Sequence, residues 1–265
     1  MSGYALNDDL ILAHRLADAA RTAIQPFFRN GLDVTNKLSD GFDPVTQADR
    51  ASETVMRQIL EEERPDDGVI GEEFASRPSR NGRNWVLDPI DGTRAFITGL
   101  PSWMVLIALS VDHEPVLGVA DQPFTRERFS GSSLGGLWRR DADQSVLRSR
   151  KTTQLDMAYI STTDPGLFEG AEISAFERVR AHCRLCRYGL DAYAYSMLAL
   201  GGLDAVIESG LKPFDIQALI PIVRASGGVI TDWRGGSAAD GGQVVAAASA
   251  ALHAEILEHL ADAAV

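Results

Sequence analysis

The chain has 265 residues, 45% of them hydrophobic and 23% charged, which suits a globular protein of one large domain or two interlocked halves. The formal net charge is -12. An acidic surface repels nucleic acid and anionic lipid, so we expect neither as a partner. No apolar run approaches the ~20 residues of a membrane-spanning helix. The N-terminal MSGYALNDDL has no basic start and no apolar segment, so we expect a cytoplasmic protein without a signal peptide.

The first half is predicted to begin with two helices and to continue as strands. Apolar residues recur at helical spacing from Leu10 to Ile24, with Asn7 as the expected N-cap. Thr46, followed three residues later by Asp49, resembles a capping box and predicts a second helix that ends at Pro65. The predicted strands are 69–71, 85–87, 104–111 and 116–121, with a hairpin turn at 112–115 and short polar strands within 126–147.

The second half alternates predicted strands with predicted helices, which favours a layered α/β arrangement. The expected strands are 157–161, 206–207, 229–231 and 244–247, and the expected helices are 166–180, 191–200, 216–225 and 251–260. The character of the sequence changes between residues 140 and 150. We therefore expect an N-terminal α+β half over 1–145 and a C-terminal α/β half over 146–265.

The only cysteines, Cys183 and Cys186, have the C-x-x-C spacing of a redox pair or of half a zinc site. A zinc site would need a further Cys or His pair at matching spacing, and the sequence has none. We therefore expect two reduced thiols near a strand.

Acidic residues are concentrated in three short stretches, at Glu72-Glu73, at Asp88 with Asp91, and at Asp215. Asp88 ends a predicted buried strand, and Pro89 cannot extend a sheet ladder, so the chain is expected to turn there. Gly92 and Thr93 are then expected to open a helical turn. This arrangement would aim the Asp88 and Asp91 carboxylates at one point, beside exposed backbone N–H groups.

Clustered oxygen ligands without His or Cys suit a hard cation such as Mg²⁺, and free N–H groups at a helix start suit phosphate. The two together indicate metal-assisted phosphoryl chemistry. The residues by themselves leave a plainer interpretation open, in which Asp88 caps a strand end and the acidic pairs are solvated turns.

Three motifs resemble the inositol monophosphatase superfamily. WVLDPIDGTRAF at 85–96 matches the family pattern W-x-x-D-P-I-D-G-T-x-x-F, and DPVTQAD at 43–49 matches an upstream segment. FDIQA at 214–218 resembles the distant W-D-x-A, with Phe214 in place of tryptophan and Gln217 inserted. Both departures agree with the branch of bacterial histidinol-phosphate phosphatases. Three longer segments also resemble that branch, namely DPIDGTRAFITGLPSW, RYGLDAYAYSMLALG and ESGLKPFDIQALIPIVRASGG.

The resemblance implies a layered α-β-α-β-α sandwich, a homodimer, and about two or three Mg²⁺ ions per site. The family's metal ligands would correspond to Glu72, Glu73, Asp88, the Ile90 carbonyl, Asp91 and Asp215, with Asp49 supporting the weaker metal together with Glu73. Thr93, Asp49 and Glu72 would be catalytic residues around the attacking water. The backbone N–H groups of Gly92 and Thr93 would hold the phosphate, and Asp191 and Glu208 would contact the rest of the substrate. Arg94 lies beside the phosphate loop, so we expect it to contact either the substrate or an interface.

The substrate that this resemblance implies is L-histidinol phosphate, whose ammonium and imidazole groups suit the Asp191 and Glu208 carboxylates. An inositol monophosphatase or another small-ester phosphatase is the first alternative. A catalytically silent metal-binding scaffold is the second. For Asp191 there is also a structural alternative, in which it only caps the helix that follows.

Overall fold

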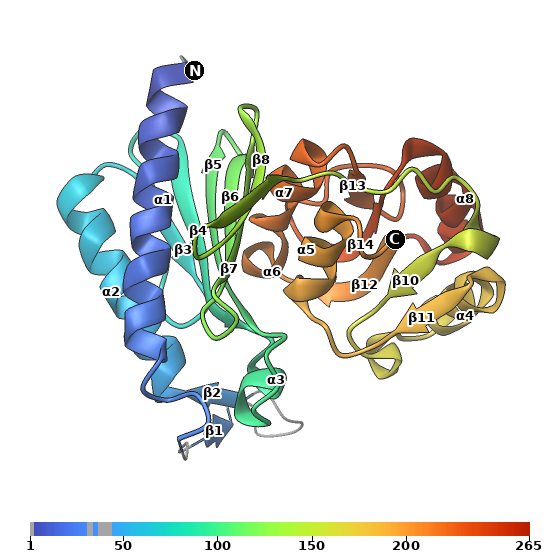
Figure 1. Ribbon diagram of the computed structural model, residues 1–265, viewed down its shortest axis with the longest axis horizontal. Coiled ribbons are helices and arrows are strands. Elements are labelled where there is room, and N and C mark those ends of the chain that lie inside the picture. The colour runs from blue at the N-terminus through green and yellow to red at the C-terminus, as the bar shows by residue number, and fades with distance from the viewer. Residues whose placement is uncertain (1–2, 31–33, 37–43) are drawn as a thin grey trace.

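The computed structural model describes residues 3–30, 34–36 and 44–265. Asp43, the first residue of the DPVTQAD motif, lies outside these ranges. The described elements form five layers in the order helix, sheet, helix, sheet, helix, which follow one another from left to right in Figure 1. The predicted α-β-α-β-α sandwich is confirmed.

The first sheet has seven strands in sequence order, and only the first pair is parallel. Its strands are β3 (Gly68–Gly71), β4 (Arg83–Asp91), β5 (Met104–Val111), β6 (Glu114–Gln122), β7 (Glu127–Ser132), β8 (Gly135–Arg140) and β9 (Asp143–Val146). The helices α1 (Gly3–Ile24) and α2 (Gln47–Glu63) cover its outer face, while α3 (Thr93–Ile97) follows β4. A separate pair, β1 (Val34–Asn36) and β2 (Pro44–Thr46), precedes α2.

The second sheet has five strands in the order β11-β10-β12-β14-β13. Their bounds are β10 (Tyr159–Ser161), β11 (Leu185–Arg187), β12 (Ala205–Leu211), β13 (Val229–Asp232) and β14 (Gly242–Ala247). Between the sheets lie α5 (Ala192–Leu200), α6 (Pro213–Ile216) and α7 (Leu219–Ala225), and outside the second sheet lie α4 (Ala171–His182) and α8 (Ala250–Leu260). Single 3-10 turns occur at Leu155–Met157, Pro165–Leu167 and Ala261–Ala263.

The strand β5 shows how the layers share their cores. Its residues alternate between the core under the middle helices, which contains Leu106, and the core under α1 and α2, which contains Ile107. Both side chains are 0% exposed. The continuous apolar run of the sequence is therefore a strand buried on both faces, as predicted.

Two glycines let the middle helices approach the first sheet. Gly118 of β6 and Gly131 of β7 are paired across the strands. A Cβ on Gly118 would lie 1.9 Å from the Ala218 carbonyl oxygen, and one on Gly131 would lie 2.4 Å from the Ile222 Cα. Any larger residue would push away the segment that carries α6 and α7.

Several predicted boundaries are wrong. The first helix begins at Gly3, so Asn7 lies inside it rather than at its cap. The predicted helix 166–180 begins only at Ala171, because residues 165–167 form a 3-10 turn capped by the Asp164 side chain. The predicted helix 216–225 is split into α6 and α7, since Pro221 has no N–H to donate to the Gln217 carbonyl.

Other local predictions are confirmed. Thr46 and Asp49 form a capping box at the start of α2. Asp112 and His113 make the hairpin turn with positive φ angles of 50° and 69°. Both cysteines are free, and Cys186 lies on β11.

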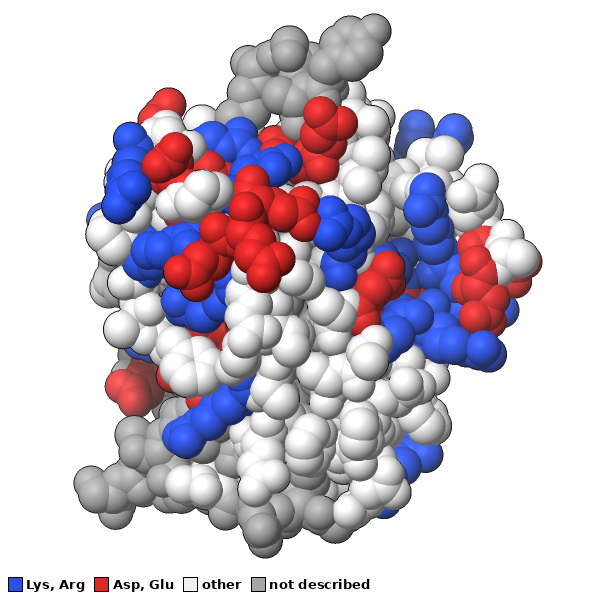
Figure 2. Space-filling model, turned by 90° about the vertical axis from the view of Figure 1, so that its left-hand side faces the viewer, with Lys and Arg blue, Asp and Glu red and all other residues white. Residues whose placement is uncertain are grey.

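On the face formed by α1 and α2, acidic and basic side chains lie interspersed (Figure 2). An example is the 2.6 Å ion pair between Arg15 of α1 and Glu63 of α2. Among the described residues, the basic side chains on this face are separated by acidic and uncharged ones. In the part of the chain that the structure describes, every helix is too short or too polar to cross a bilayer.

Candidate active site

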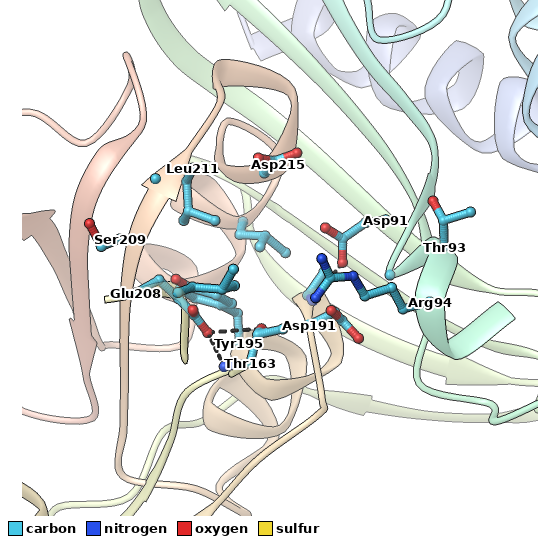
Figure 3. A pocket seen from close by; sticks show the side chains of 15 residues that line it. Asp91, Thr93, Arg94, Thr163, Asp191, Tyr195, Glu208, Ser209, Leu211 and Asp215 are labelled. Atoms are coloured by element: carbon cyan, nitrogen blue, oxygen red, sulfur yellow. Dashed lines mark hydrogen bonds between the residues drawn. The ribbon is translucent and has the colours of Figure 1, made fainter. Parts of the chain in front are cut away.

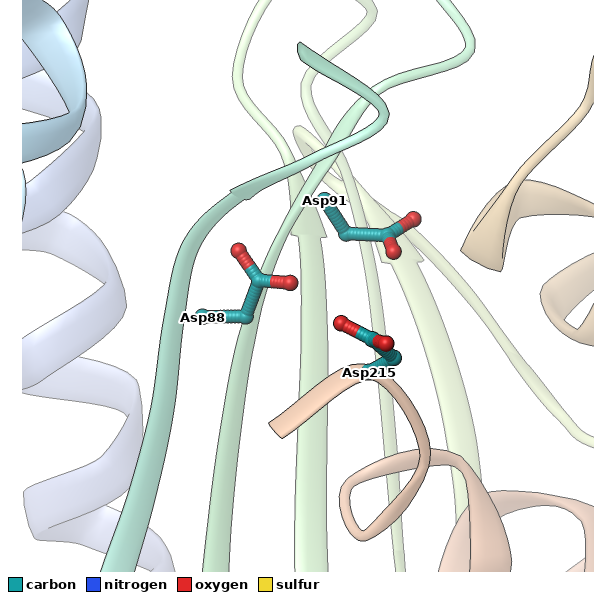
Figure 4. Close-up of side chains that lie close together, drawn as sticks. All are labelled: Asp88, Asp91 and Asp215. Atoms are coloured by element: carbon teal, nitrogen blue, oxygen red, sulfur yellow. The ribbon is translucent and has the colours of Figure 1, made fainter. Parts of the chain in front are cut away.

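Three aspartates converge at one end of the middle layer. Asp88, Asp91 and Asp215 each offer a carboxylate oxygen that lies within 4.8 Å of the others (Figure 4). Asp88 follows Val86 by two residues on β4 and therefore shares its face, which is directed toward the middle helices. Asp215 meets it there from the single turn of α6. A β-strand and a helix turn from opposite halves of the chain thus build the cluster.

The predicted turn at Pro89 is wrong, because β4 runs on through Asp91. Its pairing with β5 is irregular between Asp88 and Asp91, where Pro89 has no N–H for the ladder. Because of this irregularity, the side chains of both Asp88 and Asp91 point toward the cluster. The prediction that the two carboxylates point to one place is confirmed, although the backbone reaches this arrangement without the predicted turn.

Each carboxylate of the cluster is oriented by a backbone N–H. Asp88 Oδ1 accepts from Ile90 N at 3.0 Å, Asp91 Oδ2 from Ala192 N at 2.7 Å, and Asp215 Oδ2 from Lys212 N at 2.6 Å. These bonds tie the three side chains to β4 itself, to the first residue of α5 and to the residue that precedes α6. The cluster is therefore built into the fold and does not depend on flexible side chains meeting by chance.

The cluster is electrostatically unfavourable by itself. Burial, and then the charges of Glu72, Asp91 and Asp215, raise the pKa of Asp88 well above its ordinary value. Burial likewise raises the pKa of Asp91, and it raises that of Asp215 to about 7. Crowded carboxylates of this kind become stable as anions when a cation binds between them. An all-oxygen donor set fits a hard divalent cation.

A second acidic group lies beside the cluster, on α2 and after β3. Asp49 Oδ2 accepts from the Thr46 backbone N–H at 2.9 Å and from its hydroxyl at 2.6 Å, while the buried Oδ1 has no hydrogen-bond partner among the described residues. Burial, with the charges of Glu73 and Glu72, raises the pKa of Asp49 to about 6. Glu72 therefore lies near both Asp49 and the aspartate cluster, and Glu73 lies near Asp49. Neither is among the described carboxylates that lie within 4.8 Å of one another.

Glu53 also belongs to this region, although no sequence motif indicated it. Its side chain is fully buried, with 0% exposure, and it accepts from the Glu73 backbone N–H at 2.8 Å and from Arg57 Nε at 2.6 Å. Glu53 therefore holds the segment that carries Glu72 and Glu73. In the sequence, the feature that could have indicated Glu53 is its position four residues after Asp49, which places both residues on the same face of α2.

The turn after β4 is shaped by Gly92 and Thr93. Gly92 has a φ angle of 80°, and a Cβ on it would lie 2.9 Å from Asp191 Cγ, so only glycine fits. The Thr93 hydroxyl donates to the Ile90 carbonyl oxygen at 3.1 Å. Its one proton is therefore directed to a predicted metal ligand, and the hydroxyl oxygen remains able to accept a hydrogen bond.

A pocket of about 510 Å³ opens beside the cluster (Figure 3). Asp91, Thr93 and Arg94 lie on one side of it, and Glu208 lies on the other. Asp191 lines it from the start of α5, where it makes no side-chain capping hydrogen bond. The alternative that Asp191 only caps the helix is therefore wrong, and burial raises the pKa of this carboxyl to about 6.

Glu208 is held in the pocket by three hydrogen bonds. It follows Val206 on the face of β12 that is directed toward the middle layer. Its carboxylate accepts from Thr163 N at 2.8 Å, from Thr163 Oγ1 at 3.0 Å and from Thr162 Oγ1 at 3.2 Å. Burial raises its pKa to about 8. Thr162 and Thr163 are positioning groups that no sequence motif indicated.

The Inositol monophosphatase family model matches residues 6–264. The chain belongs to this family. The protein is thus a metal-dependent phosphoric monoester hydrolase of the inositol monophosphatase type. Among solved structures, an inositol monophosphatase from Zymomonas mobilis is similar, with 44% identity, a TM-score of 0.87 and coverage of 98% of this chain and 100% of that chain.

Two curated relatives are also similar over almost the whole chain. The chloroplastic bifunctional phosphatase IMPL2 of Arabidopsis thaliana is 40% identical over 271 residues, which cover 98% of this chain and 77% of the relative. The histidinol-phosphatase of Mycobacterium tuberculosis is 36% identical over 265 residues, covering 96% and 98%. The family assignment confirms the predicted superfamily and makes a catalytically silent scaffold the weaker alternative.

Proposed function

We propose that the protein hydrolyses L-histidinol phosphate to L-histidinol and phosphate, with Mg²⁺ as the cofactor. The observation that carries this proposal is a pair of carboxylates that line the pocket beyond the aspartate cluster, the half-buried Asp191 and the buried Glu208. An uncharged polyol ester gains little from two such acids. A leaving alcohol that carries an ammonium and a protonatable imidazole binds them through charge-assisted hydrogen bonds, each contributing roughly 1.5–3 kcal/mol.

The proposed metal ligands are Glu72, Glu73, Asp88, the Ile90 carbonyl, Asp91 and Asp215, with Asp49 beside Glu73. When bound, divalent cations lower the pKa of a water molecule and neutralise negative charge on the phosphate and on the leaving oxygen. The convergence of Asp88, Asp91 and Asp215 supports this assignment.

The chain's own groups position the water and the phosphate. We assign Thr93, Asp49 and Glu72 to the orientation of the attacking water, and the backbone N–H groups of Gly92 and Thr93 to the phosphate oxygens. The Thr93 hydroxyl is held by the hydrogen bond that it donates to the Ile90 carbonyl. Its oxygen can therefore accept a hydrogen bond from the attacking water. Water attacks phosphorus, the ester P–O bond breaks, and the departing alcohol takes a proton.

Arg94 is assigned to the pocket rim on the substrate side. Its guanidinium lies 3.9 Å from Asp164 and its charge lowers the pKa of Asp191, opposing the effect of burial. Arg94 therefore favours the ionised form of Asp191, which we propose binds the leaving alcohol.

Inositol phosphate is the second candidate substrate, and the similarity to the Zymomonas mobilis enzyme favours it. Names among the similar proteins include both activities, since one is a histidinol-phosphatase and another is an inositol monophosphatase. The chemistry of Asp191 and Glu208 is what makes us prefer the cationic ester.

A homodimer, a cytoplasmic location and the division into halves at 145/146 remain predictions.

The test is a panel of phosphate esters assayed with Mg²⁺ on the purified protein. We expect kcat/KM for L-histidinol phosphate to exceed that for inositol 1-phosphate by about ten-fold or more, the effect of 1.4 kcal/mol of selective binding. A preference for inositol phosphate would reject the substrate assignment. Hydrolysis of neither ester in the presence of Mg²⁺, Mn²⁺ or Zn²⁺ would favour the scaffold.

A further inference from the structure

Tyr195 has a buried hydroxyl that nothing in the described part of the chain satisfies. The residue is 2% exposed, it lines the pocket, and its hydroxyl oxygen has no hydrogen-bond partner among the described residues (Figure 3). An unmade hydrogen bond at a buried polar group costs about 1–3 kcal/mol. A phenylalanine would fill the same space without that cost, so packing does not account for the hydroxyl.

The position of Tyr195 places the hydroxyl among the acids of the pocket. It lies on α5, one helical turn after Asp191. Burial, followed by the charge of Glu208 and then those of Asp91 and Asp215, raises the pKa of the Tyr195 hydroxyl, which stays protonated. Glu208 already accepts three hydrogen bonds from Thr162 and Thr163.

Ionised carboxylates only accept hydrogen bonds, whereas a tyrosine hydroxyl both donates and accepts. The ammonium of the leaving alcohol favours the ionised forms of Asp191 and Glu208 when it binds between them. A neutral imidazole presents one N–H donor and one lone-pair nitrogen, and the lone pair needs a donor that ionised carboxylates cannot supply. The Tyr195 hydroxyl supplies it, and the same oxygen accepts an N–H when the ring is protonated.

We propose that the Tyr195 hydroxyl binds a ring nitrogen of the leaving alcohol and thereby selects phosphate esters that carry a heteroaromatic ring. This inference rests on the proposed function and adds a specificity residue to it. Tyr195 is a binding residue for the leaving group and takes no part in the attack on phosphorus.

The test compares Tyr195→Phe with Tyr193→Phe. Tyr193 lies on the same helix, but its hydroxyl donates to Glu127 Oε2 at 2.7 Å and does not line the pocket. For Tyr195→Phe we expect KM for L-histidinol phosphate to rise about ten-fold with kcat little changed, and the Kd of the product L-histidinol, measured by calorimetry, to rise similarly. KM for n-propyl phosphate, which has no ring, should rise less than about two-fold.

The stability of the two variants separates binding from structure. Tyr193→Phe loses a protein hydrogen bond, so its Tm should fall without a change in substrate selectivity, whereas the Tm of ligand-free Tyr195→Phe should be unchanged or higher. Unchanged KM and Kd for Tyr195→Phe, or a Tm loss with equal effects on both esters, would overturn the assignment of Tyr195 alone. A wild-type enzyme that neither prefers histidinol phosphate nor binds L-histidinol would overturn the proposed function and this inference together.

Discussion

The backbone N–H of Ala192 donates a 2.7 Å hydrogen bond to Asp91 Oδ2. Asp91 ends a strand of the first sheet, and Ala192 begins the helix that packs against the second. This bond ties a proposed metal ligand to the segment that carries Asp191. The acids that we propose as metal ligands and the acids that we propose for the leaving group are therefore connected through a direct hydrogen bond between their segments.

Asp88→Asn should lower kcat by about 10²-fold or more, since removing one preorganised electrostatic group from an active site typically has that effect. The same variant should raise the Tm of the metal-free protein, because one of three crowded acids loses its charge. Steady-state kinetics and melting curves measure both effects. Asp143→Asn on the exposed strand β9 is the control for lost charge. A fully active Asp88→Asn enzyme would contradict the assignment of Asp88 to the metal.

Mg²⁺ should raise the Tm of the wild-type protein. A ligand that binds only the folded state stabilises by ~2.7 kcal/mol at 100 times its Kd, which corresponds to about 5–10 °C for a chain of this size. The measurement is differential scanning calorimetry at constant ionic strength, with EDTA or with Mg²⁺. An unchanged midpoint at saturating Mg²⁺ would show that the aspartate cluster is not a preformed cation site.

Without divalent cations, the free energy of unfolding should decrease as the pH rises from about 4 to about 8. The pKa of Asp215 is raised to about 7 and that of Glu208 to about 8. A carboxyl whose folded pKa is raised contributes stability that is complete below its unfolded pKa and is lost as the pH passes its folded pKa. Urea unfolding in EDTA at pH 5, 6, 7 and 8 measures the slope. Asp215→Asn should flatten this slope, and a free energy of unfolding that increases with pH over this range would refute the electrostatic account.

Asp191→Asn should reduce kcat/KM for L-histidinol phosphate by roughly 10- to 100-fold, the effect of losing one charge-assisted hydrogen bond of ~1.5–3 kcal/mol. The reduction for glycerol phosphate, which has no positive charge, should be much smaller. Because Asp191 makes no capping hydrogen bond, the Tm should not fall. Equal losses for both esters would mean that Asp191 acts on the phosphate or on the fold rather than on the leaving group.

Gly118→Ala should destabilise the protein by about 1–3 kcal/mol or more, because the added methyl group would meet the Ala218 carbonyl oxygen at 1.9 Å. The displaced segment continues from α6, so the Mg²⁺-dependent rise in Tm should also shrink. Gly202→Ala is the matched control, since its Cβ would have its nearest contact at 3.4 Å. Similar Tm values for the two variants would contradict the close approach of α7 to the first sheet.

The sequence by itself determined the local features that short-range chemistry controls. The capping box of Thr46 and Asp49 and the tight turn at Asp112 and His113 depend on neighbours within a few residues. The continuous apolar run of β5 indicated a buried strand without showing what covers it. The DPIDGT motif likewise indicated a metal and phosphate site from a single continuous segment.

Only the tertiary structure decided which distant groups meet. Asp88 and Asp215 come together because β4 and α6 are packed in adjacent layers, and the glycine pair of β6 and β7 that permits this is visible only in the register of the strands. The burial of Glu53 and the unsatisfied hydroxyl of Tyr195 depend on the same packing. The physical reason is that burial and hydrogen-bond satisfaction are set by side chains far apart in the chain, whereas turns and caps are set by those next to one another.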